Sequence, residues 1–371
     1  PITQSIKNNK DLIISNVTID ATGFTAINNT NDKAASTTIT NSTIKGQVAV
    51  TMTQYHTFNA TNSTFETVGN SFDITNRSNV VTLTNCTVTS TTAYAFNNNY
   101  GHTNVNYYNK INLIGGTYTG KTHGIYMNTA LTTISGAKII TTATNENYYA
   151  LYLVNTGPIV TVNDDTEIVA ENASGIYEAS NLVIDGAKIN AKTYGIRYPA
   201  NGSNVTVSIK NIEITSDNYG ILVDDYDYGG TQTFDIESGT IYGKNYGVSL
   251  NCSKMEMTFG NNNETFTTET PVIEGGITGF VHGKGKANFY SGRFIGIEES
   301  YTNSFNKLRK GKTIYTFKQI VDEDDPTTTK KVSYLTDKDD FLQVGDDPEN
   351  TYNTFEDAIA SITNTTETIK V

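Results

Sequence analysis

The sequence predicts an all-β fold in which the chain winds into a parallel β-helix of about 11 or 12 coils, followed by a small α+β segment. Two recurring motifs support this prediction. One is a six-residue unit that reads apolar, any residue, Gly or Asn, small, any residue, apolar. The other is a small residue followed by a bulky apolar one, and both motifs occur together in residues 182–198. A third observation is that no ten-residue stretch has apolar residues at helical spacing.

The third position of the six-residue unit predicts a tight turn. Gly adopts positive φ freely, and Asn and Asp adopt it more readily than other residues. Each unit therefore predicts two short strands joined at a left-handed pivot. The predicted pivots are Asn16, Asn41, Asn62, Asn85, Gly115, Gly136, Asp164, Gly186, Asn211, Ser238 and Ser291.

The spacing of these pivots predicts a solenoid. Successive pivots are 21 to 30 residues apart, except for a last interval of 53 that fits two coils. A fixed unit with a period in the twenties is typical of solenoids. Leucine-rich repeats have a similar period, but they need several Leu per repeat and a helical return. The apolar positions before the pivots should form one buried stack, which includes Ile14, Ile39, Leu83, Leu113, Ile134, Ile184, Ile209 and Ile236.

Through its column of Asn turns, the chain resembles the pectin-lyase-like right-handed parallel β-helices, a group that includes polysaccharide lyases, phage tailspikes and repetitive microbial cell-surface adhesins. The resemblance covers about residues 10–300 and implies a right-handed, single-stranded helix. It does not imply an activity, because the same fold carries enzymes and inert stalks. Residues 1–300 are therefore predicted to form the β-helix, and residues 301–371 a C-terminal cap or linker.

The C-terminal segment has its own predicted elements. Residues 313–321 and 331–335 predict two strands around the acidic loop 322–326. Residues 352–359 predict a short amphipathic helix and residues 368–371 a strand. This ending resembles the cap that precedes a further β-helix, so we expect a longer repetitive chain. The acidic loops make Ca²⁺ an alternative to our expectation of no cofactor, although the EF-hand spacing is absent and solvated turns explain them.

Composition excludes several classes of partner. The net charge is −12 and Arg occurs only at positions 77, 197, 293 and 309, so no basic stripe is available for nucleic acid or anionic lipid. No apolar run is long enough to span a membrane. The chain is rich in Thr and Asn and has only two Cys, which favours an extracellular, cell-surface location. Cys86 and Cys252 are six coils or about 29 Å apart, too far for a disulfide, so two free thiols are expected.

One outward column has a structural explanation in both of its parts. The fifth position of the early units is Thr, and β-propensity with hydroxyl contacts between coils accounts for that column. Further along, the same column alternates in charge, which predicts a ladder of surface ion pairs worth less than about 1 kcal/mol each. The members of the column are Thr18, Thr43, Thr64, Thr87, Thr117, Lys138, Glu167, Lys188 and Glu213.

The residues that follow the small-bulky pairs predict a binding surface. Strand alternation places Tyr126, Tyr152 and Tyr177 outside in one column, and the next coils bring an Arg and an Asp- and Tyr-rich loop. Exposed aromatic rings beside carboxylates and an Arg suit a sugar or a protein epitope. Stacking that merely stabilises a sheet face is the alternative. The candidate ligand-binding residues are Tyr126, Tyr152, Tyr177, Glu178, Arg197, Tyr198, Asp224, Asp225, Tyr226 and Asp227, with Tyr228 in the same loop.

Three functions are compatible with these patterns. The leading prediction is a non-catalytic segment of a secreted or cell-surface microbial adhesin or stalk that binds a glycan or a host protein. The first alternative is a polysaccharide lyase or glycoside hydrolase, in which Asp224 or Asp225 would act with Glu178 as a pair of carboxylates. The catalytic motifs of polygalacturonase-like enzymes are not complete in this sequence. The second alternative is a structural spacer without a site.

Overall fold

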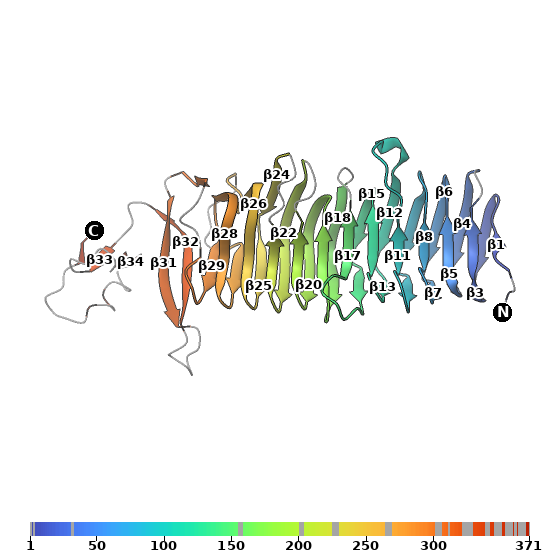
Figure 1. Ribbon diagram of the computed structural model, residues 1–371, viewed down its shortest axis with the longest axis horizontal. Coiled ribbons are helices and arrows are strands. Elements are labelled where there is room, and N and C mark those ends of the chain that lie inside the picture. The colour runs from blue at the N-terminus through green and yellow to red at the C-terminus, as the bar shows by residue number, and fades with distance from the viewer. Residues whose placement is uncertain are drawn as a thin grey trace.

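The computed structural model shows an elongated solenoid whose strands lie across its long axis (Figure 1). It has about 11 coils, and successive coils pair as parallel strands. The parts outside the described structure are residues 1, 3, 31–32, 155–158, 200–203, 225–229, 264–268, 301–305, 311, 321–328, 338–341, 345–350, 353–358, 360–361, 363–368 and 371. Among the described residues, no helix is long and apolar enough to cross a membrane.

Each coil contributes a strand to each of three faces. The first face contains β2 (Asp11–Ser15), β4 (Ala35–Thr40), β6 (His56–Thr61), β9 (Val80–Thr84), β12 (Asn109–Ile114), β15 (Ala130–Ser135), the first halves of β18 (Ile159–Ala170), β20 (Asn181–Ala191) and β22 (Thr206–Ser216), β24 (Gln232–Ile236), and the second halves of β26 (Tyr246–Phe259) and β28 (Thr278–Phe289).

The second face contains the first halves of β3 (Thr18–Asn29) and β5 (Thr43–Met52), then β7 (Thr64–Thr67), β10 (Thr87–Ser90), β13 (Thr117–Gly120), β16 (Lys138–Thr141), the second halves of β18, β20 and β22, β25 (Gly239–Gly243), β27 (Val272–Gly275) and β29 (Arg293–Gly296). The third face contains β1 (Ile6–Lys7), the second halves of β3 and β5, β8 (Phe72–Ile74), β11 (Phe96–Asn98), β14 (Ile125–Asn128), β17 (Tyr149–Val154), β19 (Ser174–Glu178), β21 (Tyr194–Tyr198), β23 (Tyr219–Val223), and the first halves of β26 and β28.

The predicted pivots lie at the corner between the first and second faces. Nine of the eleven have positive φ, from 48° at Asn41 to 82° at Gly186. At the last two positions the prediction is wrong by one residue, because positive φ falls on Gly239 and Gly292 rather than on Ser238 and Ser291. A side chain with a Cβ resists this backbone conformation, and in both places the next residue is a Gly that accepts it.

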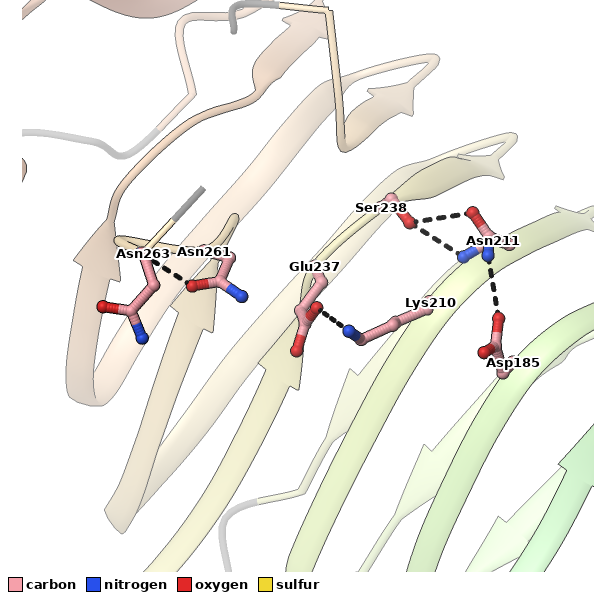
Figure 2. Close-up of polar contacts among 7 residues, drawn as sticks. All are labelled: Asp185, Lys210, Asn211, Glu237, Ser238, Asn261 and Asn263. Atoms are coloured by element: carbon pink, nitrogen blue, oxygen red, sulfur yellow. Dashed lines mark hydrogen bonds and ion pairs between the residues drawn. The ribbon is translucent and has the colours of Figure 1, made fainter. Parts of the chain in front are cut away.

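Polar contacts join neighbouring turns at this corner. The Asn211 amide donates to Asp185 in the previous coil at 2.8 Å, and the backbone N–H of Asn211 donates to the Ser238 hydroxyl at 2.9 Å (Figure 2). Beside them, Lys210 and Glu237 form an ion pair at 2.5 Å (Figure 2). Stacked turns therefore satisfy one another's polar groups from coil to coil.

The core is the continuous stack predicted from the repeat. In register, Ile184 pairs with Ile209 and Ile209 with Ile236, and each is at most 1% exposed. The small member of each small-bulky pair is also explained. A Cβ at Gly195 would collide with the Ile214 side chain and with the Gly220 carbonyl oxygen, so the coils approach too closely there for a larger residue.

The outward column on the second face is as predicted. The five Thr residues pair in register from Thr18 to Thr117, and the column continues into the charged residues. Lys138 pairs with Glu167 at 2.7 Å and Lys188 with Glu213 at 3.5 Å. Cys86 and Cys252 are both buried and are not joined in a disulfide, as expected from their separation.

The chain continues beyond the last full coil. The parallel stack ends with β30 (Lys307–Leu308), and β31 (Lys312–Ile320) and β32 (Thr329–Asp337) form an antiparallel hairpin, as predicted. β32 also pairs antiparallel with β29 and so covers that edge of the second face.

A separate antiparallel sheet contains β33 (Leu342–Val344), β34 (Thr351–Tyr352) and β35 (Ile369–Lys370). The helix predicted over 352–359 starts on a residue that belongs to β34, and most of its remainder lies outside the described residues, as does the acidic loop 322–326.

Candidate functional site

The predicted tyrosine column is present on the third face. Tyr126 pairs in register with Tyr152, Tyr152 with Tyr177, and Tyr177 with Arg197. The residue before each tyrosine points inward and is fully buried, as strand alternation requires. The three tyrosine side chains are each half-buried on the outside of the wall.

A second aromatic column, which the sequence reasoning missed, lies at the corner between the second and third faces. Its members are Tyr94, His123 and Tyr149, each directly before a small-bulky pair. Tyr94 stacks on Tyr126 with ring centroids 5.6 Å apart, and His123 stacks on Tyr152 at 4.6 Å. Tyr149 meets Tyr177 edge-on at 5.2 Å. Each corner ring thus contacts the face ring of the following coil, and we name these six residues the aromatic ladder.

The rings of the ladder cover one another's faces. Tyr126 and Tyr152 are 5.4 Å apart with an angle of 20° between ring planes, and Tyr152 and Tyr177 are 4.5 Å apart at 21°. This offset-stacked arrangement is favourable for aromatic pairs. Because the faces are occupied by neighbouring rings, the ladder presents ring edges and hydroxyl groups outward. Its chemistry is therefore hydrogen bonding by phenols, rather than the stacking of a sugar on an open ring face.

Burial sets the protonation of these rings. It raises the pKa of Tyr126, Tyr152 and Tyr177 further above an ordinary value that already keeps the phenols protonated at neutral pH. Burial also lowers the pKa of His123 to about 4, and the Tyr149 carbonyl oxygen, 3.2 Å from Nδ1, opposes this shift because it can accept a hydrogen bond from the protonated ring. The Tyr149 N–H donates to Nδ1 of His123 at 2.9 Å. The ladder is therefore uncharged at neutral pH.

An ion pair lies at one end of the ladder. Nε of Arg197 contacts Oδ2 of Asp224 at 2.7 Å, and its Nη1 donates to the Tyr149 hydroxyl at 3.3 Å. The guanidinium also lies 5.3 Å from the centroid of the Tyr194 ring. Burial alone would lower the pKa of Arg197, but its hydrogen bonds to Tyr149 and Asp224 outweigh that effect and raise it. Arg197 and Asp224, both candidate binding residues, are thus in contact across neighbouring coils.

Two of the predicted site residues are not on this surface. Glu178 and Tyr198 both point into the core and are fully buried, so their assignment to an exposed binding surface is wrong. The physical reason is strand alternation, which continues past the outward Tyr177 and Arg197 and turns the next residue inward. Glu178 accepts a hydrogen bond from the Ser180 N–H, and burial raises its pKa well above the usual range. Since Glu178 is inside the wall and Asp224 outside, the two carboxylates do not face one substrate.

The remaining candidates lie outside the described residues. Asp225, Tyr226, Asp227 and Tyr228 all belong to residues 225–229.

Tyr194, Tyr219 and Tyr246 form a further corner column, with Tyr219 and Tyr246 stacked at 4.9 Å. Within the described part of the chain, no group of three or more His, Cys, Asp or Glu side chains is arranged to hold a metal ion.

A shallow hollow adjoins the ladder at the same corner. Its volume is about 550 Å³, and its walls combine amides, hydroxyls, one acid and one base: Thr144, Asn145, Glu146, Asn147, Asn172, Lys192 and Thr193. Lys192 pairs with Asp217 at 2.6 Å. The next residue after Asn147 is Tyr148, which is 38% exposed and contacts the edge of His123. Tyr148 thus follows directly on a wall residue of the hollow and contacts a member of the ladder.

Comparisons with known proteins add nothing to this geometry. No family model, curated protein or solved structure matches the chain. The resemblance to pectin-lyase-like helices therefore depends on the pivots and coil spacing of this chain alone.

Proposed function

We propose that this chain is a rigid, non-catalytic segment of a secreted or cell-surface adhesin, and that it binds a glycan chain along the aromatic ladder and the adjoining hollow. The observation that carries the proposal is the row of protonated phenols on successive coils, ending at the Arg197–Asp224 pair. The outward column described on the second face consists instead of Thr and then of alternating Lys and Glu, which the stability of the sheet explains.

A neutral glycan suits this surface better than an anionic one. Arg197 and Lys192 are both already paired with carboxylates, and Glu146 lines the hollow. Phenol hydroxyls, amides and paired charges donate and accept hydrogen bonds, as the hydroxyl groups of a sugar require. A protein partner would need a larger apolar centre than the edges of these rings offer.

A pure binding role is favoured over hydrolysis because the second carboxylate considered for catalysis is inside the wall. Hydrolysis of a glycosidic bond requires two carboxyl groups on either side of that bond. Asp224 faces outward and is held by Arg197, while Glu178 is fully buried.

The test is a glycan array followed by matched variants. The Tyr126→Phe, Tyr152→Phe, Tyr177→Phe triple variant keeps the stacked rings and removes only the hydroxyls. We expect its affinity for the best array ligand to fall by about 10-fold or more, since each lost hydrogen bond costs about 0.5–1.5 kcal/mol. The control is Tyr219→Phe with Tyr246→Phe, a stacked pair outside the ladder, which should bind normally. Undiminished affinity in the triple variant would refute the ladder as the site, and no binding to any glycan would support a structural spacer.

A further inference from the structure

A second cluster of aromatic and basic side chains lies at the corner between the third and first faces. The guanidinium carbon of Arg77 is 4.3 Å from the centroid of the Tyr107 ring and 5.7 Å from that of Tyr55. Tyr107 ends the short 3₁₀ helix η1 (Val105–Tyr107), in the excursion between β11 and β12. Backbone hydrogen bonds hold the layers together, from the Tyr55 N–H to Arg77 and from the Ser78 N–H to Tyr107. We name Tyr55, Arg77, His102 and Tyr107 the Arg77 corner.

The Arg77 side chain differs from the other three arginines in its partners. Arg197 pairs with Asp224, Arg293 with Glu269 at 3.9 Å, and Arg309 donates to two backbone carbonyls. Within the described residues, no carboxylate or other hydrogen-bond acceptor contacts the side chain of Arg77. Its contacts are with aromatic rings, which leave the N–H groups at the rim of the guanidinium plane available. That rim is the geometry with which Arg binds the two oxygens of an oxyanion.

The sequence that follows Asp73 is poor in acidic residues. Between Asp73 and Glu146 there is no Asp or Glu, while Arg77, Lys110, Lys121 and Lys138 are all basic. The chain as a whole has a net charge of −12, so residues 74–145 are a locally basic exception. A bound anion at the Arg77 corner would therefore meet no carboxylate from residues 74–145, and the carboxylate of Asp73 already accepts hydrogen bonds from the Asn70 and Asn97 amides.

His102 and Tyr55 supply two further groups. Nδ1 of His102 accepts a hydrogen bond from the Asn104 N–H at 2.8 Å, so in the neutral ring the proton is on Nε2, which is a donor. The His102 ring packs edge-on against Tyr107 with centroids 4.9 Å apart. Tyr55 is 40% exposed, and no aromatic ring in the described structure stacks on it. Unlike the rings of the ladder, Tyr55 thus has an open flank against which the apolar side of a sugar ring packs favourably.

We propose that the Arg77 corner is a second binding site, separate from the aromatic ladder, for a sugar unit that carries an oxyanion, either a carboxylate or a sulfate. Arg77 and Nε2 of His102 bind the anionic group, and Tyr55 packs against the sugar ring. The site does not depend on the proposed function of the ladder, where the cations are already paired.

The four arginines allow a direct test on the whole chain. In protein labelled with ¹³C at the arginine guanidinium carbon, each arginine gives one signal in the NMR spectrum. The signals of Arg77 and Arg197 are assigned by their disappearance in the Arg77→Lys and Arg197→Lys variants. The probes are glucuronic acid, glucose 6-sulfate, acetate and glucose. We expect glucuronic acid or glucose 6-sulfate to shift the Arg77 signal saturably and glucose to leave it unchanged. Whichever of these two compounds binds more tightly identifies the anionic group that the site prefers. The signal of Arg197, which lies at the end of the ladder, should not shift with glucuronic acid or with glucose 6-sulfate.

Two matched variants separate the parts of the site. Tyr55→Ala should weaken the binding of glucuronic acid or glucose 6-sulfate by about three- to tenfold without changing the response to acetate. The reason is that, within the ligand, the sugar ring contacts Tyr55 and the anionic group does not, while Tyr107 still packs against Arg77. Arg293→Lys is the control, and it should change neither the affinity for the anionic sugars nor the response to acetate. The proposal fails if the Arg77 signal does not move, if glucose moves it equally, or if all four arginine signals shift together. If acetate binds as tightly as glucuronic acid and Tyr55→Ala affects neither, the sugar contact is refuted.

Discussion

Arg197 reaches back across two coils and donates a hydrogen bond to the hydroxyl of Tyr149, which is 48 residues earlier in the chain. The corner position between them is Ser174, which pairs in register with Tyr149 and is fully buried. Its small side chain leaves room for the guanidinium where another ring would block it. The arginine therefore joins the two columns of the aromatic ladder and ties both to Asp224.

The first prediction concerns this link. A double-mutant cycle between Arg197→Ala and Tyr149→Phe should give a coupling free energy of about 0.5–1.5 kcal/mol, measured by urea unfolding. The exposed pair of Lys188 and Glu213 is the control, and its coupling should be smaller, below about 1 kcal/mol and strongly salt-dependent. Additive effects of the two substitutions would show that the contact contributes nothing.

The second prediction is that His123 makes stability fall as the pH falls. Its pKa is lowered to about 4 in the folded chain from an ordinary value near 6.5, because burial penalises the charged ring. Between these values the unfolded chain binds the proton more readily, so the free energy of unfolding decreases from pH 6.5 towards pH 4. Between pH 7 and pH 5 the free energy of unfolding of the His123→Phe variant should decrease by about 2 kcal/mol less than that of the natural chain. Equal decreases in the two proteins would contradict this.

The third prediction has the opposite sign and concerns Glu178. Burial raises its folded pKa, so the protonated carboxyl contributes stability that is fully present below about pH 4.5 and is lost as the pH rises. Glu178→Gln should therefore stabilise the chain by about 1–3 kcal/mol at pH 8 and have little effect at pH 4, as measured by urea unfolding. Glu213→Gln, on the exposed surface, serves as the control. A Gln variant less stable than the natural chain at pH 8 would show that a partner stabilises the charged carboxylate.

The fourth prediction tests the core stack. Ile209 is fully buried between Ile184 and Ile236, and its coil cannot collapse without shifting the neighbouring coils. Ile209→Ala should lower the free energy of unfolding by about 2–5 kcal/mol, and Ile209→Asp should prevent folding. Val183→Ala on the outside of the same face, where the side chain is 38% exposed, should cost far less. Similar losses at the two positions would mean that the inner and outer faces are assigned the wrong way round.

The coil architecture was predictable because its signals are local. A pivot needs a residue that tolerates positive φ, and Asn, Asp or Gly supplied it at nine of eleven positions. At Ser238 the pattern matched by position but not by chemistry, and Gly239 took the conformation with φ of 120°. The register of Tyr126, Tyr152 and Tyr177 followed in the same way from their equal distance to the small-bulky pairs.

The site was less predictable because it combines residues by shape rather than by motif. A carboxylate directly after Tyr177 suggests the end of a strand, yet β19 extends to Glu178 and alternation turns it inward. The corner column was detectable in principle, since Tyr94, His123 and Tyr149 share one position relative to the small-bulky pairs. Their diagonal contacts with the next coil, however, depend on side-chain directions that only the fold determines. The Arg77 corner brings together three separate turns and has no signature in any one of them.

The stacked phenols have an optical consequence. The chain has no Trp, so its near-ultraviolet signal comes chiefly from its 23 tyrosines. Among the tyrosines in the described part of the chain, most lack the close parallel neighbours that Tyr126, Tyr152 and Tyr177 have. Rings held a few ångströms apart in a fixed, twisted series couple their electronic transitions, whereas isolated rings do not. The near-ultraviolet circular dichroism of the unmodified protein should therefore carry an exciton band from the ladder. That band would disappear if the coils around Tyr152 separated, which gives the protein an internal reporter of this region that needs no label.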